Sequence, residues 1–322
     1  MELENNLVLA PMAGITDSPF RQLARVGGAG LVCGEMVSAK ALVFADSKTR
    51  RMLRISEKER PVSLQIFGPD PATMSEAAAI VEQAGADIID INFGCPVPKV
   101  AKSGSGAVLL SNEKLISEIM EAVVKRVKAP VTAKIRIGRN SGENVAPALA
   151  GIAGKCGISA IIIHGRAAEQ GHKGNPDLEA IKKAKDACSI PVIGNGGITS
   201  EQTALDFFEQ TGCDGIMIGR GAAGDFGIFN RIAHFLKTGE SQPPPTWEKR
   251  IEDFKHHARL SVEFYGGDIG IIRLRKLAVY YLKGLPNASM LRDKFCKTET
   301  LADMDTLLAQ MWESPYFKEQ YD

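Results

Sequence analysis

The 322-residue sequence lacks a long hydrophobic run, a disulfide pattern and a metal-binding motif. No apolar stretch approaches ~18 residues, the length of a membrane-spanning helix, and the acidic start of the chain lacks the basic and apolar parts of a secretory signal. Six cysteines are scattered without a Cys-x-x-Cys pair, and the histidines do not cluster. We therefore expect a cytoplasmic protein with reduced thiols, without a bound metal, a disulfide framework or a membrane partner.

Strong net charge is also absent. With 39 Lys and Arg against 38 Asp and Glu, the chain has a formal net charge of +1. A protein that binds RNA over its whole surface would be far more basic, so any RNA-binding surface must be local. One basic segment does occur: residues 273–297 contain seven basic residues and one acid, whereas the residues beyond Thr298 are mainly acidic.

Short β-branched runs recur from residue 7 to residue 219, separated by segments with helical periodicity. This alternation is typical of a parallel sheet with helical crossovers, and eight such units favour a closed (β/α)8 TIM barrel of the α/β class. No Gly-x-Gly-x-x-Gly motif follows the first run, which disfavours a dinucleotide-binding open sheet. The eight runs are residues 7–10, 30–36, 62–67, 87–92, 131–137, 160–164, 191–195 and 214–219.

Each run ends in a side chain that can form hydrogen bonds or titrate. In a barrel the carboxyl ends of the strands surround the active site, so these polar residues should converge on one pocket. An open sheet would not bring all eight ends together. In chain order the residues are Met12, Glu35, Gln65, Asn92 with Cys95, Lys134 with Arg136, His164 with Arg166, Asn195, and Gly219 with Arg220.

The sequence predicts two domains. Residues 1–238 contain the strand and helix units of the barrel. Residues 239–246 include Gly239 and the triplet Pro243-Pro244-Pro245, which cannot continue a helix and indicate a stiff extended linker. Residues 247–322 show helical spacing without strand alternation, so we expect a small all-helical C-terminal domain.

Two glycine-rich turns follow the last two strands, at Gly196-Gly197 and at Gly219-Arg220-Gly221. Barrels often bind phosphate there through backbone N–H groups and a helix N-terminus, so a phosphate site is favoured over turns of purely structural use. Gln65, Asn92 and Lys134 offer amide and cationic donors that would suit the carbonyl and ring-nitrogen edge of an isoalloxazine. The residues alone would permit other phosphorylated ligands.

Cys95 lies directly after a strand, in the run Asn92-Phe93-Gly94-Cys95-Pro96, between a glycine that frees the backbone and a proline that fixes it. A buried structural cysteine and a reactive cysteine are both consistent with this pattern. A carboxylate pair of Glu35 and Asp90 would suit acid–base catalysis, but structural hydrogen bonding is the favoured interpretation. Asp17 is expected to cap a helix.

The motifs Pro11-Met12-Ala13-Gly14-Ile15-Thr16-Asp17, Asn92-Phe93-Gly94-Cys95-Pro96 and Gly219-Arg220-Gly221 resemble the signature set of the tRNA-dihydrouridine synthases, in detail the bacterial B-type. The resemblance covers nearly the full length. It implies a barrel that binds FMN, takes electrons from NADPH and reduces the C5–C6 bond of specific uridines in tRNA, with Cys95 as the general acid. The residues that match the family's FMN-binding positions are Pro11, Met12, Ala13, Gln65, Lys134, His164, Asn195, Gly196, Gly197, Gly219 and Arg220.

The resemblance also implies contacts to tRNA. The family's flexible loop after the cysteine corresponds to residues 99–106 with Lys99 and Lys102, although an ordinary solvated loop would look the same. Arg136 and Arg166 are further candidates for binding the substrate. In the C-terminal domain, three basic residues and a tyrosine share one predicted helix face, which suits phosphate contacts and base stacking, although most basic helix faces are only solvated. This face consists of Arg273, Lys276, Tyr280 and Lys283, opposite the apolar Leu274, Leu277, Ala278, Tyr281, Leu282 and Leu285.

The sequence departs from the family pattern at Ala167, Ala168, His172, Gly197 and Leu277. Any effect of these differences should fall on contacts to the target nucleotide and the flanking RNA rather than on cofactor binding. A flavin enzyme acting on a free pyrimidine, similar to dihydroorotate dehydrogenase, and a non-catalytic RNA-binding protein on the same scaffold are the alternatives. No obligate protein partner is indicated, and we expect a monomer.

Overall fold

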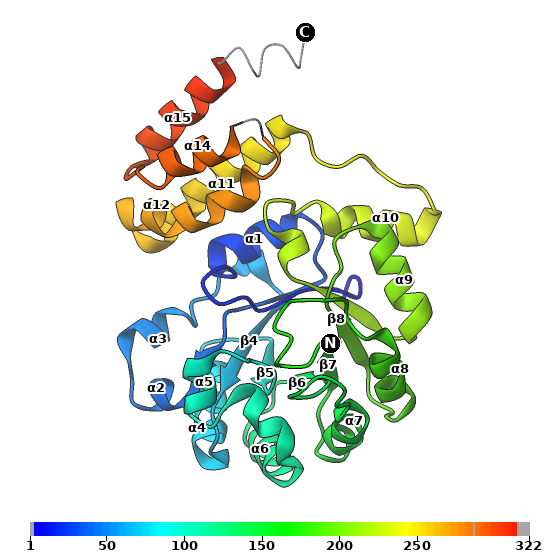
Figure 1. Ribbon diagram of the computed structural model, residues 1–322. Helices are drawn as coiled ribbons and strands as arrows, with labels where there is room; N and C mark the ends of the chain where they lie inside the picture. The colour runs from blue at the N-terminus through cyan, green and yellow to red at the C-terminus, as the bar shows by residue number, and fades with distance from the viewer. Residues whose placement is uncertain (1–2, 286, 314–322) are drawn as a thin grey trace. The chain divides into compact units, whose positions relative to one another are not determined.

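The computed structural model describes residues 3–285 and 287–313 (Figure 1). The chain divides into two compact units. One unit consists of Met1–Gly221 with Ile228–Gln242, and the other of Ala222–Gly227 with Pro243–Asp322. The sequence did not indicate that residues 222–227 belong with the C-terminal helices.

Parallel strands form the sheet of the first unit. β1 pairs with β2 and with β9, and β2 also pairs with β4, so eight strands close into a barrel, with the short β3 as an additional strand on β4. The predicted TIM barrel with a helical C-terminal region is therefore confirmed. The strands are β1 (Leu7–Leu9), β2 (Leu31–Cys33), β3 (Val37–Ser38), β4 (Val62–Phe67), β5 (Ile88–Asn92), β6 (Val131–Arg136), β7 (Ala160–His164), β8 (Val192–Asn195) and β9 (Gly215–Ile218).

A ring of helices surrounds the barrel (Figure 1). The strands are covered by these helices outside and filled by side chains inside, which is why they read as continuous apolar runs. Val8, Ile88 and Ile162 come from strands on different sides of the ring and pack in one cluster, so this cluster fills the interior. The helices are α1 (Ser18–Val26), α2 (Ala39–Val43), α3 (Ser47–Arg51), α4 (Pro71–Gln83), α5 (Pro98–Lys102), α6 (Glu113–Arg126), α7 (Ala146–Lys155), α8 (Leu178–Asp186), α9 (Glu201–Thr211) and α10 (Ile228–Thr238).

The second predicted strand, residues 30–36, is shorter in the structure, where only Leu31–Cys33 form β2. β3 begins after the predicted run, at Val37; β2 and β3 both pair with β4, and residues 34–36 belong to neither strand. A Cβ atom on Gly34 would lie 2.7 Å from Leu64 Cδ2, so the backbone packs too closely here for another side chain. The break allows the Glu35 carboxylate to accept a hydrogen bond from the backbone N–H of Gly14, in the loop after β1.

That loop, between β1 and α1, is closed by its own hydrogen bonds. Met12 N donates to Thr16 Oγ1 over 2.9 Å, and Thr16 N donates to the Met12 carbonyl oxygen over 3.0 Å. Asp17 caps α1 by accepting a bond from Phe20 N at 3.2 Å, as predicted. The shape of the turn therefore depends on short polar side chains rather than on apolar packing.

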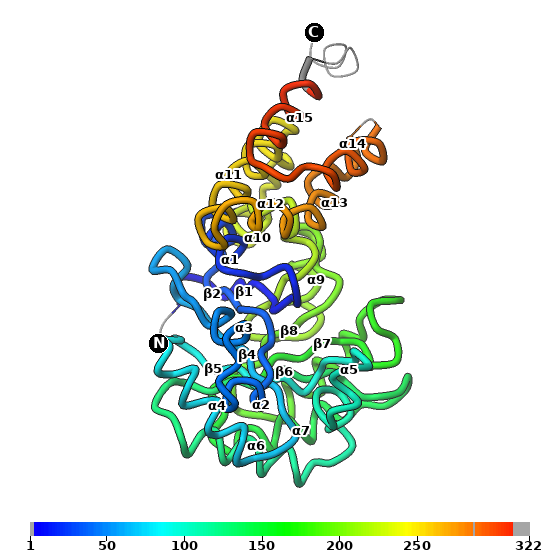
Figure 2. Tube along the Cα trace, turned by 90° about the vertical axis from the view of Figure 1, so that its left-hand side faces the viewer, coloured from blue at the N-terminus to red at the C-terminus, as the bar shows by residue number. Residues whose placement is uncertain are grey.

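Figure 2 traces the backbone of the helical unit, α11 to α15. Aromatic side chains pack together inside this unit. Phe254 stacks on Tyr281 with ring centroids 4.5 Å apart, and the buried Tyr281 hydroxyl lies 2.8 Å from His257 Nδ1. A Cβ atom on Gly224 would lie 2.7 Å from the Tyr280 carbonyl, so a glycine lets residues 222–227 pack against this unit. The elements are α11 (Trp247–Tyr265), α12 (Asp268–Leu274), the 3-10 turn Arg275–Leu277, α13 (Ala278–Tyr281), α14 (Ala288–Phe295) and α15 (Leu301–Glu313).

Within residues 3–285 and 287–313, no helix is long and apolar enough to cross a membrane.

Candidate active site

The register of the barrel brings the predicted polar residues to one end. Asn92 on β5 lies beside Lys134 on β6, and His164 on β7 lies beside Asn195 on β8. Lys134 Nζ also donates to Asn195 Oδ1 over 3.0 Å. Four consecutive strands thus present their terminal side chains to the same space, as the sequence predicted for the carboxyl ends of a barrel.

A chain of buried hydrogen bonds runs from Asp90 to the cysteine loop. Gln65 Nε2 donates to Asp90 Oδ2 over 2.6 Å, and Asn92 Nδ2 donates to Gln65 Oε1 over 2.7 Å. Asn92 Oδ1 in turn accepts from the backbone N–H of Cys95 at 2.9 Å. Because a carboxylate accepts only, this chain orients both amides and fixes the backbone at Cys95.

Asp90 and Glu35 do not form a catalytic pair. Asp90 accepts from Gln65 and, over 2.7 Å, from the Thr132 hydroxyl, while Glu35 holds the loop after β1. Burial raises the pKa of Asp90, and the hydrogen bonds from Thr132 and Gln65 lower it only in part. The structure therefore favours the structural interpretation of both carboxylates.

Cys95 is a free thiol that is only 9% exposed. Burial raises its pKa above the ordinary cysteine value, and the Val97 backbone and the cations Arg136 and Lys134 offset this only in part. At neutral pH the side chain is therefore a thiol that can give a proton rather than a thiolate nucleophile. Of the other cysteines, Cys33, Cys156 and Cys213 are buried, Cys188 is half-buried and Cys296 is exposed.

The segment after Cys95 is more ordered than a flexible loop. Residues Pro98–Lys102 form α5, and Gly106–Ser111 form a 3-10 helix. Lys99 and Lys102 are exposed on α5. Ala107 N donates to the Cys95 carbonyl over 3.0 Å, and a Cβ atom on Gly106 would lie 2.6 Å from that same oxygen. A proline at the start of α5 and the buried Val100 favour the helix over an open loop.

A cluster of cationic groups faces this end of the barrel. Burial and the neighbouring Arg136 lower the pKa of Lys134 to about 8. Burial lowers the pKa of Arg136 to about 10. Burial and the charges of Lys134, Arg136 and Arg166 also lower the pKa of His164, and burial, followed by the charge of Arg220, lowers that of Arg166. The cationic cluster consists of Lys134, Arg136, Arg166 and Arg220, and the neutral imidazoles of His164 and His172 lie among these cations. Their mutual repulsion would be relieved by a bound anion, so a phosphate fits this site.

The glycines in the turns after β8 and β9 bring the backbone close to neighbouring side chains. Gly196 has a φ of +124°, and a Cβ atom there would lie 2.8 Å from His164 Cδ2. Gly197 has a φ of +73° and lies beside Pro176. Gly219 follows β9 near the Met12 sulfur, and the exposed Arg220 begins a 3-10 turn. Glycine is therefore required at position 196, where both the backbone angle and the space exclude a side chain.

Arg136 and Arg166 have backbone partners that the sequence did not reveal. Arg136 donates to the carbonyls of Gly94 at 2.9 Å, Ala167 at 3.0 Å and Gly171 at 2.8 Å. Arg166 donates to the Gly174 carbonyl at 2.9 Å and to His164 Nε2 at 3.2 Å. Because a guanidinium only donates, His164 Nε2 must accept. Both arginines thus hold the loop of residues 167–174 around the site.

Sequence reasoning did not predict the buried ion pair of Arg21 and Glu59. Arg21 Nε lies 2.6 Å from Glu59 Oε2, and Arg21 Nη1 donates to the Thr16 carbonyl over 2.8 Å. Both charged side chains are almost inaccessible, at 2% and 0% exposure. The pair anchors the end of the Met12–Thr16 turn. No spacing signal links residues 38 positions apart, so only the fold reveals the pair.

The predicted tRNA face of the helical unit is only partly a single helix. The chain changes from α12 to a 3-10 turn at Arg275, whose Nε donates to the Thr298 carbonyl over 2.6 Å. The predicted apolar face is buried nevertheless, and Arg273, Lys276 and Lys283 are exposed. Tyr280 is half-buried. Arg273 lies over the ring of Tyr265, with its guanidinium carbon 4.3 Å from the centroid.

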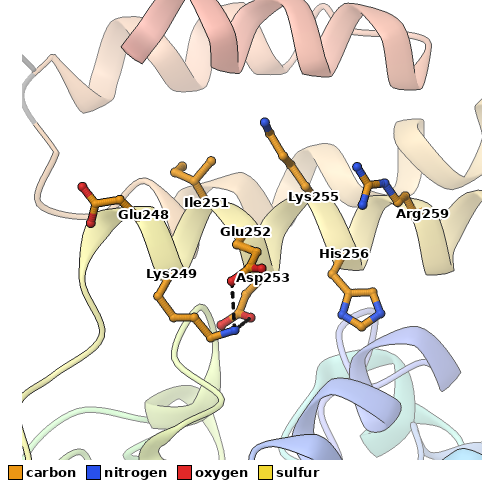
Figure 3. Close-up of a pocket in the computed structure, with 8 residues that line it drawn as sticks. All are labelled: Glu248, Lys249, Ile251, Glu252, Asp253, Lys255, His256 and Arg259. Atoms are coloured by element: carbon orange, nitrogen blue, oxygen red, sulfur yellow. Dashed lines mark hydrogen bonds and ion pairs between the residues drawn. The ribbon is translucent and has the colours of Figure 1, made fainter.

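A hollow in the helical unit lies along α11 (Figure 3). Charges of both signs line it, and Lys249 Nζ lies 2.9 Å from Asp253 Oδ1. This mixture produces no field of one sign, so it does not resemble the cationic cluster of the barrel. The lining residues are Glu248, Lys249, Ile251, Glu252, Asp253, Lys255, His256 and Arg259.

Comparison with known families shows to which family the chain belongs. The family model of dihydrouridine synthases matches residues 8–315. The chain belongs to the dihydrouridine synthase family. A probable tRNA-dihydrouridine synthase of Rickettsia bellii is 41% identical over 293 residues, which cover 91% of this chain and 90% of that protein. The tRNA-dihydrouridine synthase B of Pseudomonas aeruginosa is 42% identical over 310 residues, covering 96% and 92%. The resemblance inferred from the motifs is thereby confirmed.

Solved structures with lower identity share the fold. Histamine dehydrogenase from Rhizobium sp. 4-9 is 13% identical and superimposes with a TM-score of 0.55, covering 80% of this chain and 49% of that one. The 6-hydroxypseudooxynicotine amine oxidase of Pseudomonas geniculata N1 is 14% identical, with a TM-score of 0.58, covering 73% and 48%. At such low identity the similarity concerns the barrel alone.

For this dihydrouridine synthase, the departures after His164 are explained by backbone contacts. Arg136 binds the carbonyl of Ala167, which any residue type at that position would provide. His172 lies with its ring centroid 5.9 Å from that of His164, and burial and the charge of Arg220 lower its pKa. The backbone contact at Ala167 therefore does not depend on which side chain stands there.

Lys134 predicts a pH effect on the stability of the ligand-free synthase. The pKa of Lys134 is about 8 in the folded chain, against ~10.4 for an unperturbed lysine. Between these values the unfolded chain keeps the proton that the folded chain has released, so stability rises with pH there. Below pH 8 both states are protonated, and the buried ammonium destabilises the fold. The free energy of unfolding of wild type, measured with urea, should therefore increase relative to that of Lys134→Met between pH 8 and 10. A constant difference would contradict the assignment.

Proposed function

We propose that the chain is an FMN-dependent tRNA-dihydrouridine synthase that takes electrons from NADPH and reduces the C5–C6 bond of specific uridines. The observation that supports this best is the position of Cys95. A protonated, buried thiol is held by Asn92 beside an anion-binding cationic cluster at the carboxyl end of the barrel. Membership of the family and the names of the bacterial relatives support the same reaction.

The barrel residues would hold FMN in two ways. Gly196, Gly197 and Arg220 would bind its phosphate, because the glycines open the backbone and the arginine is exposed above them. Lys134 would lie at the ring system, where a positive charge favours the reduced, anionic form. The other contacts would come from Pro11, Met12, Ala13, Gln65, Asn92, His164, Asn195 and Gly219. When bound, FMN would supply a hydride to C6 of the uracil ring.

Cys95 would complete the reduction. After a hydride reaches C6, the carbon at C5 carries the negative charge and takes the proton of the thiol, so the S–H bond breaks as the C–H bond forms. The thiolate is reprotonated from solvent before the next turnover. Arg136 and Lys134 would stabilise this transient thiolate, because both lower the pKa of Cys95.

Transfer RNA would be the substrate of this site. A stacked base must leave the helix to reach a buried thiol, so the enzyme must bind the flanking RNA as well. Lys99 and Lys102 are placed for such contacts at the cysteine loop, and Arg273, Lys276, Tyr280 and Lys283 offer them in the C-terminal unit. The proposal includes two domains, with catalysis in residues 1–238, tRNA binding in residues 247–322, and residues 239–246 as the linker. The protein would be a monomer in the cytoplasm.

Identification of the cofactor tests the proposal. Purified protein should be yellow and should release FMN on denaturation, because the phosphate and ring-binding groups meet at one end of the barrel. Chromatography of the released pigment against FMN and FAD standards gives the measurement. Release of FAD, or no flavin after reconstitution with FMN, would refute the cofactor assignment.

A further inference from the structure

One strongly basic surface of the barrel has no part in the site described above. It is the α2–α3 segment, residues 39–51, between β3 and β4. Lys40, Lys48, Arg50 and Arg51 are all exposed there, and the one acid of the segment is Asp46. The Asp46 carboxylate caps α3 by accepting from the Thr49 backbone N–H at 2.7 Å, so it is already engaged.

The cations of α3 differ from those on the outer helices of the barrel. Exposed lysines on α6 and α8 form ion pairs one turn away, as in Lys125 with Glu121 at 3.0 Å and Lys182 with Asp186 at 2.8 Å. Across the described residues, Lys48, Arg50 and Arg51 make no ion pair, although Lys48 interacts electrostatically with the Asp46 carboxylate. The three cations outnumber this one carboxylate, so a polyanion would be attracted to this surface.

An exposed aromatic side chain belongs to the same segment as these cations. Phe44 is the C-cap of α2 and is 75% exposed. The next residue, Ala45, has a φ of +59°. A left-handed conformation is unfavourable for a residue with a Cβ atom. An unfavourable turn therefore follows directly after the exposed phenyl ring.

The α2–α3 segment is on the same edge of the barrel as Cys95. Ala39, the first residue of α2, has its Cβ 3.2 Å from where a Cβ atom on Gly68 would lie. The adjacent Pro69 lies 3.5 Å from the corresponding position at Gly104, in the segment that follows Cys95. Successive contacts therefore link α2 through the turn after β4 to the cysteine loop and α5 (Figure 1).

We propose that the α2–α3 segment is a second RNA-binding surface of the barrel, which binds phosphates through Lys48, Arg50 and Arg51 and an unpaired base through Phe44. This inference rests on the proposed function, which makes the RNA a tRNA. Cations alone would suit any polyanion, but an exposed aromatic ring among them is the combination that binds single-stranded nucleic acid. The exposed Lys99 and Lys102 of α5 extend the surface toward the buried thiol.

The test measures binding of a labelled tRNA transcript to the full-length protein at several salt concentrations. In the variant Lys48→Gln with Arg50→Gln and Arg51→Gln, the slope of log affinity against log salt should fall by about 2 to 3, because each lost phosphate contact removes about 0.7–0.9. Phe44→Ala should weaken binding roughly 10-fold with an unchanged slope, since stacking releases no counterions.

A matched control is available at the other end of the barrel. Arg126 and Lys128 are exposed where α6 leads into the start of β6, far along the chain from the cysteine loop. The double variant Arg126→Gln with Lys128→Gln should keep both affinity and slope. Flavin content should be unchanged in all variants, because none of these residues belongs to the cationic cluster of the barrel.

Two failures can be told apart. If wild-type protein forms dihydrouridine in the transcript with NADPH, but the α3 variant keeps the wild-type affinity and slope, the surface assignment is wrong and the proposed function stands. If the wild-type protein forms no dihydrouridine, the proposed function is wrong. The assignment would also be overturned if the control variant reduced the slope as much as the α3 variant does. The slope would then depend on the net charge of the protein and not on this surface.

Discussion

Cys95→Ala should lower the rate of uridine reduction by about 10²–10⁴-fold, the usual contribution of a general acid. In the proposed reaction the alanine removes the proton that C5 would receive, and among the described residues Asn92 holds no other cysteine. Flavin content and reduction of the flavin by NADPH should be unchanged, because neither process uses the thiol. Single-turnover measurements of each half-reaction separate the two effects.

Cys213→Ala serves as the matched control for Cys95→Ala. Cys213 is also a buried free thiol whose pKa is raised by burial, but it packs against Gly194 in the barrel wall. The control variant should therefore reduce uridine at nearly the wild-type rate. Near-normal dihydrouridine formation by Cys95→Ala would exclude Cys95 as the proton donor.

Arg21→Met should lower the free energy of unfolding by about 3–5 kcal/mol, the usual cost of removing one partner from a buried ion pair. The substitution leaves the inaccessible Glu59 carboxylate without its guanidinium and the Thr16 carbonyl without a donor. Because Thr16 closes the turn that contains Met12, flavin binding should weaken as well. Urea denaturation of the ligand-free protein measures the stability change.

An exposed ion pair provides the comparison. Lys125 and Glu121 on α6 are 75% and 47% exposed, and exposed pairs contribute only about 0–1 kcal/mol. Lys125→Met should therefore change the free energy of unfolding little. The double variant Arg21→Met with Glu59→Leu should recover much of the loss, because both buried charges are then removed. A loss below about 1 kcal/mol for Arg21→Met alone would contradict the role of the pair.

The barrel could be predicted because its signal is local and repeated. Each strand is a β-branched run, and the polar residue at its end is adjacent in sequence, as with Asn92 at the end of β5 and His164 at the end of β7. The rule that active sites lie at the carboxyl ends of barrel strands then brings these residues together without further information. Spacing alone located the site, and the resemblance supplied the chemistry.

Tertiary partners could not be predicted from spacing. Arg136 and Arg166 bind carbonyls in residues 167–174, and the path of that loop leaves no pattern in the sequence. A Cβ atom at Gly34 would collide with Leu64, which lies on a different strand, so the need for glycine after β2 is not visible in the local sequence. The basic face of the C-terminal unit was derived for one straight helix, and the change at Arg275 to a 3-10 turn alters the positions of Lys276 and Tyr280.

Analysis of nucleosides from a tRNA transcript tests the central claim most directly. The transcript, made without modified bases, is incubated with the purified protein, FMN and NADPH, digested, and examined by mass spectrometry. The account predicts a nucleoside heavier than uridine by two hydrogens, with the chromatographic behaviour of dihydrouridine, and its absence when NADPH is omitted. A transcript that stays unchanged, although the protein binds FMN and NADPH reduces it, would contradict the account.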